Sequence, residues 1–147
     1  MTDLTIGDIV PGERIGSFYL GMPRPELIRL IPAGSPVERR GSCEMITAAP
    51  LRFWIDDRTD TVTQVLADRG FKGRLLGVVS VEDSLNEVRE RIEREEEDWD
   101  SDTLIFPSHP GVCFDLGKEA WGKSSAEWGS CPVDYFAVFV PDPPSSS

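Results

Sequence analysis

Histidine and cysteine, the residues that most often supply bases, nucleophiles and metal ligands, are scarce in this chain. Of its 147 residues, one is histidine and three are cysteine. His109 falls in a predicted turn and Cys113 in a predicted strand, so they are not expected to form a nucleophile–base pair. The scattered cysteines have no zinc-ligand spacing. We therefore expect that the chain is not an enzyme and uses no metal or cofactor, although a mechanism based on carboxylates alone remains open.

Long hydrophobic runs are missing as well. No apolar stretch approaches the ~20 residues that cross a bilayer, and the first residues lack the features of a secretory signal. These absences predict a cytoplasmic protein without a membrane partner. An odd cysteine count without a C-x-x-C pair also argues against a disulfide framework. Buried free thiols are the simplest interpretation, and a bridge between Cys113 and Cys131 is the alternative.

Two short segments resemble ligand-binding loops only in composition. The stretch "GFKGRLLG", residues 70–77, is rich in glycine but leads into a predicted strand, whereas a phosphate-binding loop leads into a helix. The stretch "DDRTD", residues 56–60, lacks the glycine and the distal glutamate of a calcium loop. We predict a hairpin turn for the second stretch.

Positive charge is in deficit. The chain has 26 acidic side chains against 15 lysines and arginines, a formal net charge of -11. A field of that sign repels phosphates and anionic lipids and attracts basic proteins. Nucleic acid is therefore not expected as a direct partner. The expected partner is a basic protein. The alternative is that the acidity only maintains solubility.

One pattern occurs twice in the chain. "GERIGSFYLGMPRPELIRLI", residues 12–31, and "GRLLGVVSVEDSLNEVRERI", residues 73–92, align at one constant offset, with glycines matched near the start and isoleucines matched at the end. Each copy begins with a period-2 apolar alternation, which predicts a short strand, and continues with helical apolar spacing. We interpret the match as an internal duplication.

Each alternation is followed by a predicted helix. In the first copy, Pro23 and Pro25 suit an opening turn, where a missing N–H costs little. In the second copy, Ser84 begins a capping box. We predict a helix from Ser84 to about Glu97, with an acidic outer side, and with Trp99 capping its apolar stripe.

A strand pair is predicted after each helix. Trp54 falls within the first pair and is expected in the core. The second pair is joined by a long tip, residues 118–132, that is rich in glycine and serine. The predicted strands are residues 51–57 and 61–67 in the first half and residues 111–117 and 134–140 in the second.

These elements predict an α+β fold of two tandem β-α-β-β repeats, about residues 12–67 and 73–140. The repeats are expected to form one antiparallel sheet or two, with both helices packed on one face. Residues 1–140 then make a single domain. The tail "PDPPSSS", residues 141–147, is predicted to be disordered.

The stretch "IGSFYLGMPRPELIRLI", residues 15–31, resembles a lead-in of small bacterial proteins: a glycine-flanked strand, "LGM", and a helix that contains a glutamate. It resembles the start of the outer-membrane assembly lipoprotein family, which is related to the beta-lactamase inhibitory proteins, and it is similar to cytosolic immunity proteins for bacterial toxins. The tandem organisation is similar to that of the inhibitory proteins. This chain lacks the lipobox cysteine of the lipoproteins. The resemblance implies a non-catalytic fold that binds other proteins.

These features predict a cytoplasmic immunity protein that neutralises a bacterial toxin, such as a basic nuclease, by occlusion. The tryptophans of the polar tip are expected to anchor the partner, and an acidic run is expected to steer it. The predicted partner-binding residues are Trp121, Trp128, Glu93, Glu95, Glu96, Glu97, Asp98 and Trp99.

Alternatives to this prediction remain open. The two tip tryptophans can instead fold back over the hairpin, and the charge run can be a solvated helix face. The second functional hypothesis is a small-molecule-binding module, with an unknown ligand held between the helices and the sheet.

Overall fold

The computed structural model describes residues 3–98 and 103–141, so Trp99 and most of the predicted tail lie outside the described residues. The fold is α+β, with two antiparallel sheets and few short helices. None of the described helices is long and apolar enough to cross a membrane. The small sheet contains β1 (Ile9–Val10), β2 (Arg14–Ile15) and β3 (Phe18–Tyr19). The large sheet contains β4 (Val37–Arg40), β5 (Cys43–Ala48), β6 (Leu51–Asp56), β7 (Thr61–Asp68), β8 (Glu96–Asp98), β9 (Thr103–Ile105), β10 (Val112–Leu116) and β11 (Val133–Phe139). The helices are α1 (Arg24–Leu30), α2 (Leu85–Arg91) and the 3-10 helices η1 (Lys118–Ala120) and η2 (Ser125–Ser130).

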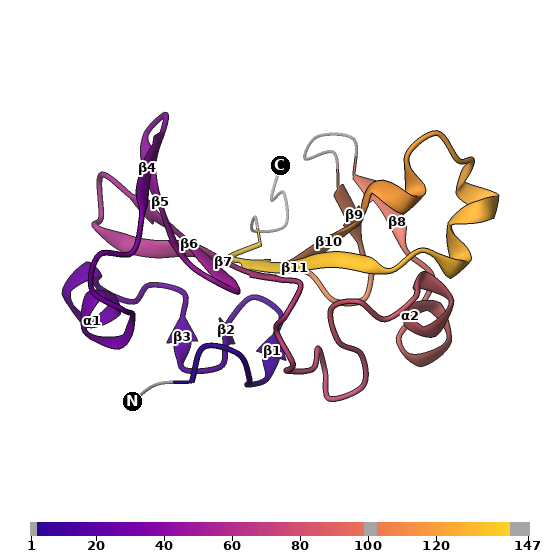
Figure 1. The fold of residues 1–147 in the computed structure, drawn as a ribbon, viewed down its shortest axis with the longest axis horizontal. Coiled ribbons are helices and arrows are strands. Elements are labelled where there is room, and N and C mark those ends of the chain that lie inside the picture. Colours follow the sequence, from indigo (N-terminus) through magenta and orange to yellow (C-terminus); the bar gives the residue numbers. More distant parts are fainter. Residues whose placement is uncertain (1–2, 99–102, 142–147) are drawn as a thin grey trace, which may run out of the picture.

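The large sheet is continuous, in the order β4-β5-β6-β7-β11-β10-β9-β8. Its two central strands come from opposite halves of the chain: Val65 of β7 lies opposite Val138 of β11. On one side of this junction α1 precedes four strands, and on the other side α2 precedes four strands (Figure 1). The two halves therefore share one sheet, a point that the sequence left open.

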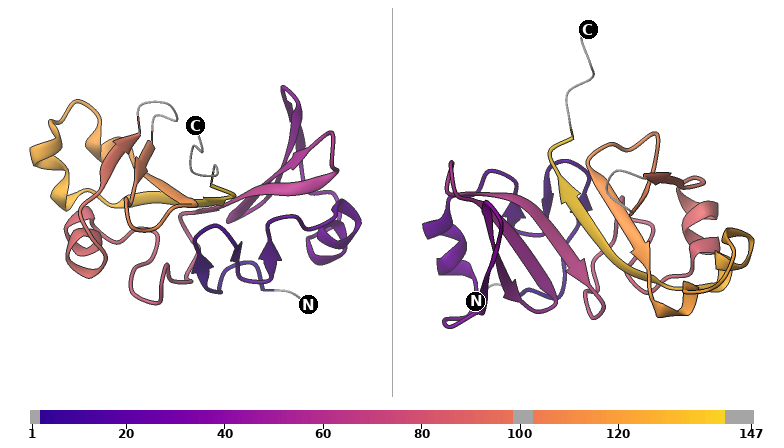
Figure 2. Two further views of the ribbon diagram at one scale, coloured as in Figure 1. Left: turned by 180° about the vertical axis from the view of Figure 1, so that it is seen from behind. Right: turned by 90° about the horizontal axis from the view of Figure 1, so that it is seen from above.

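Both helices and the small sheet lie on the same side of the large sheet (Figure 1, Figure 2). Leu27 of α1 and Val88 of α2 are fully buried in the main hydrophobic core on that side. The rings of Phe18 and Phe53, with centroids 4.9 Å apart, join the small sheet to the large one. Each such side chain stabilises the fold by ~1.5–3 kcal/mol through burial.

The predicted helix starts are confirmed. Pro25 lies in the first turn of α1, and the Ser84 hydroxyl accepts a hydrogen bond from the Glu87 N–H at the start of α2. The predicted extent of the second helix is wrong, because α2 ends at Arg91 rather than near Glu97. Beyond it, Ile92 leaves the helical conformation and packs partly buried against the core, and the acidic run forms the edge strand β8, paired with β9.

The four predicted strands are present as β6, β7, β10 and β11, and residues 57–60 form the turn between β6 and β7. The short strand predicted before the first helix is present as β3, but the one predicted before the second helix is wrong, because residues 76–78 form a turn there, closed by an isolated bridge between Leu75 and Val79. Strands β1, β2, β4, β5, β8 and β9 were not predicted. Trp54 was expected in the core, but it is only partly buried, whereas its neighbour Phe53 is fully buried. All three cysteines are free thiols, and Cys113 and Cys131 belong to separate apolar clusters, so the alternative of a bridge does not hold.

Candidate protein-binding surface

The large sheet carries a second apolar cluster on the side turned away from the helices. Side chains alternate sides along a strand. Because Phe53 and Phe136 point into the main core, their neighbours Trp54 and Ala137 point the other way. The buried members of this second cluster are Leu66, Cys113 and Ala137, and its partly buried members are Trp54, Ile105, Tyr135 and Phe139. We name this side of the sheet the open face, defined by those residues.

The sheet register arranges the open face in rows. Cys113 lies opposite Ile105 of β9 and opposite Ala137 of β11, and Ala137 lies opposite Leu66 of β7. This makes one apolar row across four neighbouring strands. The aromatic members stand around these smaller buried residues. Partly exposed aromatic side chains around a small apolar centre are typical of protein interfaces.

Carboxylates accompany the apolar row, mostly on the half of the face that contains β8. Burial raises the pKa of Asp68, and the negative charge of the nearby Asp134 adds to the rise. The ion pair with Arg52 lowers this pKa but does not cancel the rise. Arg52 Nε lies 2.9 Å from Asp68 Oδ2 but outside hydrogen-bond geometry. The open face carries excess negative charge because its four carboxylates outnumber Arg52, which lies opposite Leu66. The acidic residues, each with its cross-strand neighbour, are Glu96 (Ile105), Asp98 (Thr103), Asp115 (Tyr135) and Asp68 (Tyr135).

The thiol on this face is buried. Burial raises the pKa of Cys113 to about 11, and the negative charges of Asp98 and Asp115 add to the rise. A hydrogen bond with Thr103 lowers this pKa only in part. The thiol is therefore protonated at neutral pH. His109 lies in the segment between β9 and β10, edge-on to the ring of Phe106. Within residues 3–98 and 103–141, no group of three His, Cys, Asp or Glu side chains is placed to hold a metal ion.

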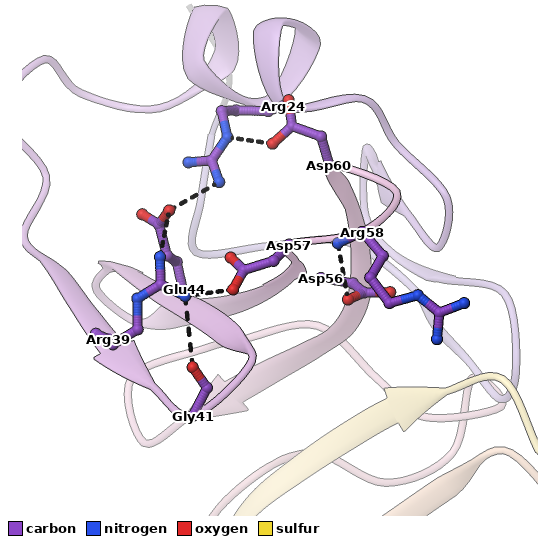
Figure 3. A network of polar contacts seen from close by, with 8 residues as sticks. All are labelled: Arg24, Arg39, Gly41, Glu44, Asp56, Asp57, Arg58 and Asp60. Carbon is purple, nitrogen blue, oxygen red and sulfur yellow. Dashed lines mark hydrogen bonds and ion pairs between the residues drawn. The ribbon is translucent and has the colours of Figure 1, made fainter.

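The β4–β5 hairpin rises on the side of the open face at the opposite end of the sheet (Figure 1). A network of ion pairs fixes its position (Figure 3). Glu44 Oε1 accepts a hydrogen bond from Arg24 Nη2 at 3.2 Å and lies 3.5 Å from Arg39 Nη2. Arg24 also donates to Asp60 at 2.6 Å, and Arg39 pairs with Asp57. These contacts tie the hairpin to the start of α1 and to the β6–β7 turn.

A pocket of about 390 Å³ lies at the ends of β10 and β11. Asp115 belongs both to the pocket lining and to the open face, so the two are continuous. Arg69 crosses the pocket lining to bind Asp134 at 2.9 Å and Glu119 at 3.1 Å. Trp121, also in the lining, is 73% exposed. Such an exposed indole beside charged groups is suited to contact a partner.

Some of the predicted partner-binding residues gather at this surface. Glu96 and Asp98 lie on β8, opposite residues of β9 that share the side of the open face. Trp121 lines the adjoining pocket. The end of the acidic run, Glu96–Asp98, is nevertheless an edge strand and not the helix face that the sequence predicted.

Other predicted residues lie elsewhere. Glu93 accepts hydrogen bonds from the backbone and hydroxyl of Ser108, both at 2.9 Å. Glu95 forms an ion pair with Arg89 that keeps its side chain largely buried. Glu97 lies opposite the core residue Leu104. Trp128 packs partly buried against the main core, and its Nε1 donates to the Lys123 carbonyl at 3.2 Å. Trp99 lies outside the described residues.

The aromatic and aliphatic residues of the open face were not predicted from the sequence. A signal was available in "YFAVFV", residues 135–140, where apolar residues run without alternation. Such a run indicates a strand that is buried on both faces, so Tyr135 and Phe139 belong to a second apolar surface. Trp54, between Phe53 and Ile55, carries the same signal in β6.

No family model, no curated protein and no solved structure matches this chain.

Proposed function

We propose that this protein binds a basic protein on its open face and inhibits that partner by covering its working surface. One observation carries the proposal: four partly buried apolar side chains stand around a buried apolar row on a face that neither α1 nor α2 covers. An antiparallel sheet that faces water usually presents polar side chains there. Apolar patches of this kind mark interaction sites.

The charge of the surface supports a basic partner. Glu96, Asp98 and Asp115 lie along the apolar row, and the whole chain carries a net charge of -11. Complementary charge accelerates association and rejects acidic competitors. A nuclease toxin fits this chemistry, because carboxylates of the inhibitor would occupy places where substrate phosphates bind. This proposal agrees with the resemblance of residues 15–31 to immunity proteins.

We also propose that the two halves are related copies, as the paired sequence pattern predicts. The same order of a short helix and four strands on each side of the β7–β11 junction supports this. The matched glycines Gly16 and Gly77 both have positive φ, at 58° and 75°. Superposition of residues 24–68 on residues 85–139 in an experimental structure tests the proposal, and different chain paths would contradict it.

A small-molecule function is less favoured. Its ligand was expected between the helices and the sheet, but that region is filled by the main core. Leu27, Leu85 and Phe53 are each fully buried there.

The binding proposal is tested with the protein encoded beside this gene as the candidate partner, by calorimetry of the purified pair. The double variant Trp54→Thr, Tyr135→Thr keeps β-forming residues in the strands and is expected to weaken binding by at least about 30-fold, the value of one interface hot spot. Tyr19→Thr is the matched control, because Tyr19 is 40% exposed on a strand of the small sheet. Equal affinity of the double variant and the wild type would contradict the proposal.

The charge component is tested separately. Reversal of two carboxylates, Glu96→Lys and Asp98→Lys, is expected to slow association and to reduce its dependence on salt. Trp121→Ala reports on the adjoining pocket. If the reversal accelerates association instead, the partner is acidic and the proposed partner class is wrong.

A further inference from the structure

A tight turn between β7 and α2 holds a leucine in an unfavourable backbone conformation. Leu76 and Gly77 have φ of 53° and 75°, and the Val78 N–H donates to the Leu75 carbonyl at 3.0 Å. Two positive φ values are the mark of a type I′ turn, whose first central position favours asparagine, aspartate or glycine. A leucine is sterically disfavoured there. The strain needs an explanation from what the side chain contacts.

Burial does not supply that explanation. Leu76 is 40% exposed and Val78 is 38% exposed, whereas the flanking Leu75 and Val79 are fully buried. Leu75 and Val79 therefore anchor the turn in the core, and they leave two apolar side chains at its tip. A strained and exposed leucine weakens the fold without filling the core. Strained residues of this kind cluster at active sites and ligand-binding sites.

A pocket of about 430 Å³ lies beside this tip, lined by Arg74, Gly77, Val78, Ser80, Asp83 and Arg91. The Arg74 guanidinium and the Ser80 hydroxyl make no hydrogen bond or ion pair with the described part of the chain. The contacts of Arg91 Nη1 are long: 3.4 Å to the Val78 carbonyl, 3.8 Å to Glu87 and 3.9 Å to Asp83. The Arg74 guanidinium and the Ser80 hydroxyl are therefore available to a ligand, and Arg91 can join them by giving up these long contacts.

The charge of this pocket is opposite to that of the whole chain. Its lining holds two arginines and one carboxylate, Asp83, whose Oδ2 already accepts the Ser80 N–H at 2.8 Å. Guanidinium and hydroxyl groups suit carboxylate or phosphate oxygens. We propose that this pocket binds an anionic oxygen group, carboxylate or phosphate, on a ligand whose apolar part contacts Leu76 and Val78. The turn lies on the helix side of the large sheet, away from the open face (Figure 1), so this site is independent of the proposed inhibitor function.

The test is an NMR titration of the full chain with acetate, hexanoate and inorganic phosphate. Backbone amides of Gly77 and Val78 and the Nε–H groups of Arg74 and Arg91 are the reporters. Hexanoate is expected to bind at least about tenfold more tightly than acetate, since burial of two of its four additional methylene groups gives that ratio. Equal affinity for hexanoate, acetate and phosphate would overturn the apolar part of the proposal and indicate a site for free anions. No shifts at these reporters would overturn it entirely.

Two variants separate a ligand role from a structural one. Arg74→Gln is expected to lower the affinity for all three anions about tenfold. The control is Arg58→Gln, in an exposed turn without a described ion pair, which is expected to leave these affinities unchanged. Leu76→Asn fits the type I′ turn, so it is expected to raise Tm and to abolish the preference for hexanoate over acetate. A fall in Tm would show that Leu76 serves the fold, and an unchanged preference would show that it does not contact the ligand. Either result would overturn the proposal.

Discussion

Arg69 Nε lies 2.9 Å from Asp134 Oδ1, so a residue that follows β7 is tied to the start of β11. The same guanidinium donates from Nη2 to Glu119 Oε2 at 3.1 Å, and this hydrogen bond lowers the pKa of Glu119. Glu119 lies in η1, directly before the exposed Trp121. One arginine therefore connects the centre of the sheet to the turn that carries the tryptophan of the adjoining pocket.

Arg69→Gln is expected to release that turn. Because the paired side chains are largely exposed, the change should lower Tm by less than about 4 °C, while the Trp121 indole becomes more mobile. The ¹⁵N relaxation of its Nε1–H measures this mobility. Arg40→Gln is the control, since it removes a comparable exposed ion pair, with Glu38, on β4. Unchanged order at Trp121 in Arg69→Gln would show that other contacts hold the turn.

Phe53 and Trp54 are expected to differ sharply when each is replaced by alanine. Phe53 is fully buried in the main core, so Phe53→Ala should cost about 3–5 kcal/mol of unfolding free energy. Trp54 is only partly buried on the open face, so Trp54→Ala should cost about 1–2 kcal/mol despite its larger side chain. Urea denaturation of the two variants measures the difference. Similar losses would place Trp54 in a closed core.

Glu95 is expected to stabilise the fold, whereas Glu96 is expected to contribute little to stability. The Glu95 side chain is 7% exposed and receives hydrogen bonds from Arg89 at 2.8 and 2.9 Å. Glu95→Gln should therefore lower the unfolding free energy at pH 7 by about 1–3 kcal/mol. Glu96 is exposed on the edge strand, so the control Glu96→Gln should change it by less than about 0.5 kcal/mol. A larger effect of Glu96→Gln on stability would contradict the assignment of this residue to the binding surface.

The effect of Glu95→Gln should depend on pH. Burial, the largest single influence, raises the pKa of Glu95, but the hydrogen bonds from Arg89, a backbone hydrogen bond and the charges of Arg89 and Arg94 together outweigh it, and the net pKa is lowered from 4.5. The unfolded chain then binds the proton more readily than the fold does. The carboxylate stabilises the fold above pH 4.5, and this contribution is lost as the pH falls through the lowered value. The difference between wild type and Glu95→Gln should therefore shrink in acid, which unfolding curves over a pH series measure.

Cys113 is expected to resist thiol reagents in the folded protein. Its pKa of about 11 leaves little thiolate at pH 8, and Cys131 is buried as well. Cys43 is partly exposed and should react first with a chromogenic disulfide reagent. In denaturant all three thiols should react. Loss of the fast phase in Cys113→Ser, rather than in Cys43→Ser, would contradict the burial of Cys113.

The elements that sequence reasoning recovered are those with strong apolar patterns. Residues 61–67 and 134–140 are rich in β-branched and aromatic residues, and they form β7 and β11 at the centre of the sheet. The edge strands β4, "VERR", and β8, "EED", carry no apolar periodicity. They are strands because β5 and β9 supply hydrogen-bond partners, which no local pattern reveals.

The same limit applies to the candidate site. Trp121 was found because an indole in a polar, glycine-rich tip has little local reason to be buried, and it is exposed. Trp128 stands in the same tip and packs on the main core instead. The acidic run also divides, with Glu95 turned inward to Arg89 and Glu96 on the exposed strand. Such differences between neighbours arise from distant packing partners.

The sequence by itself determined the acidic charge, the α+β elements with their helix starts, and the apolar segments that build the sheet, because these follow from composition and local spacing. Only the tertiary structure decided which apolar residues belong to the core and which to the open face. The pairing of β7 with β11 across the two halves of the chain determines which side each residue faces. The pairing gave one sheet with α1 and α2 on a single side, and so left Trp54 and Tyr135 on the other.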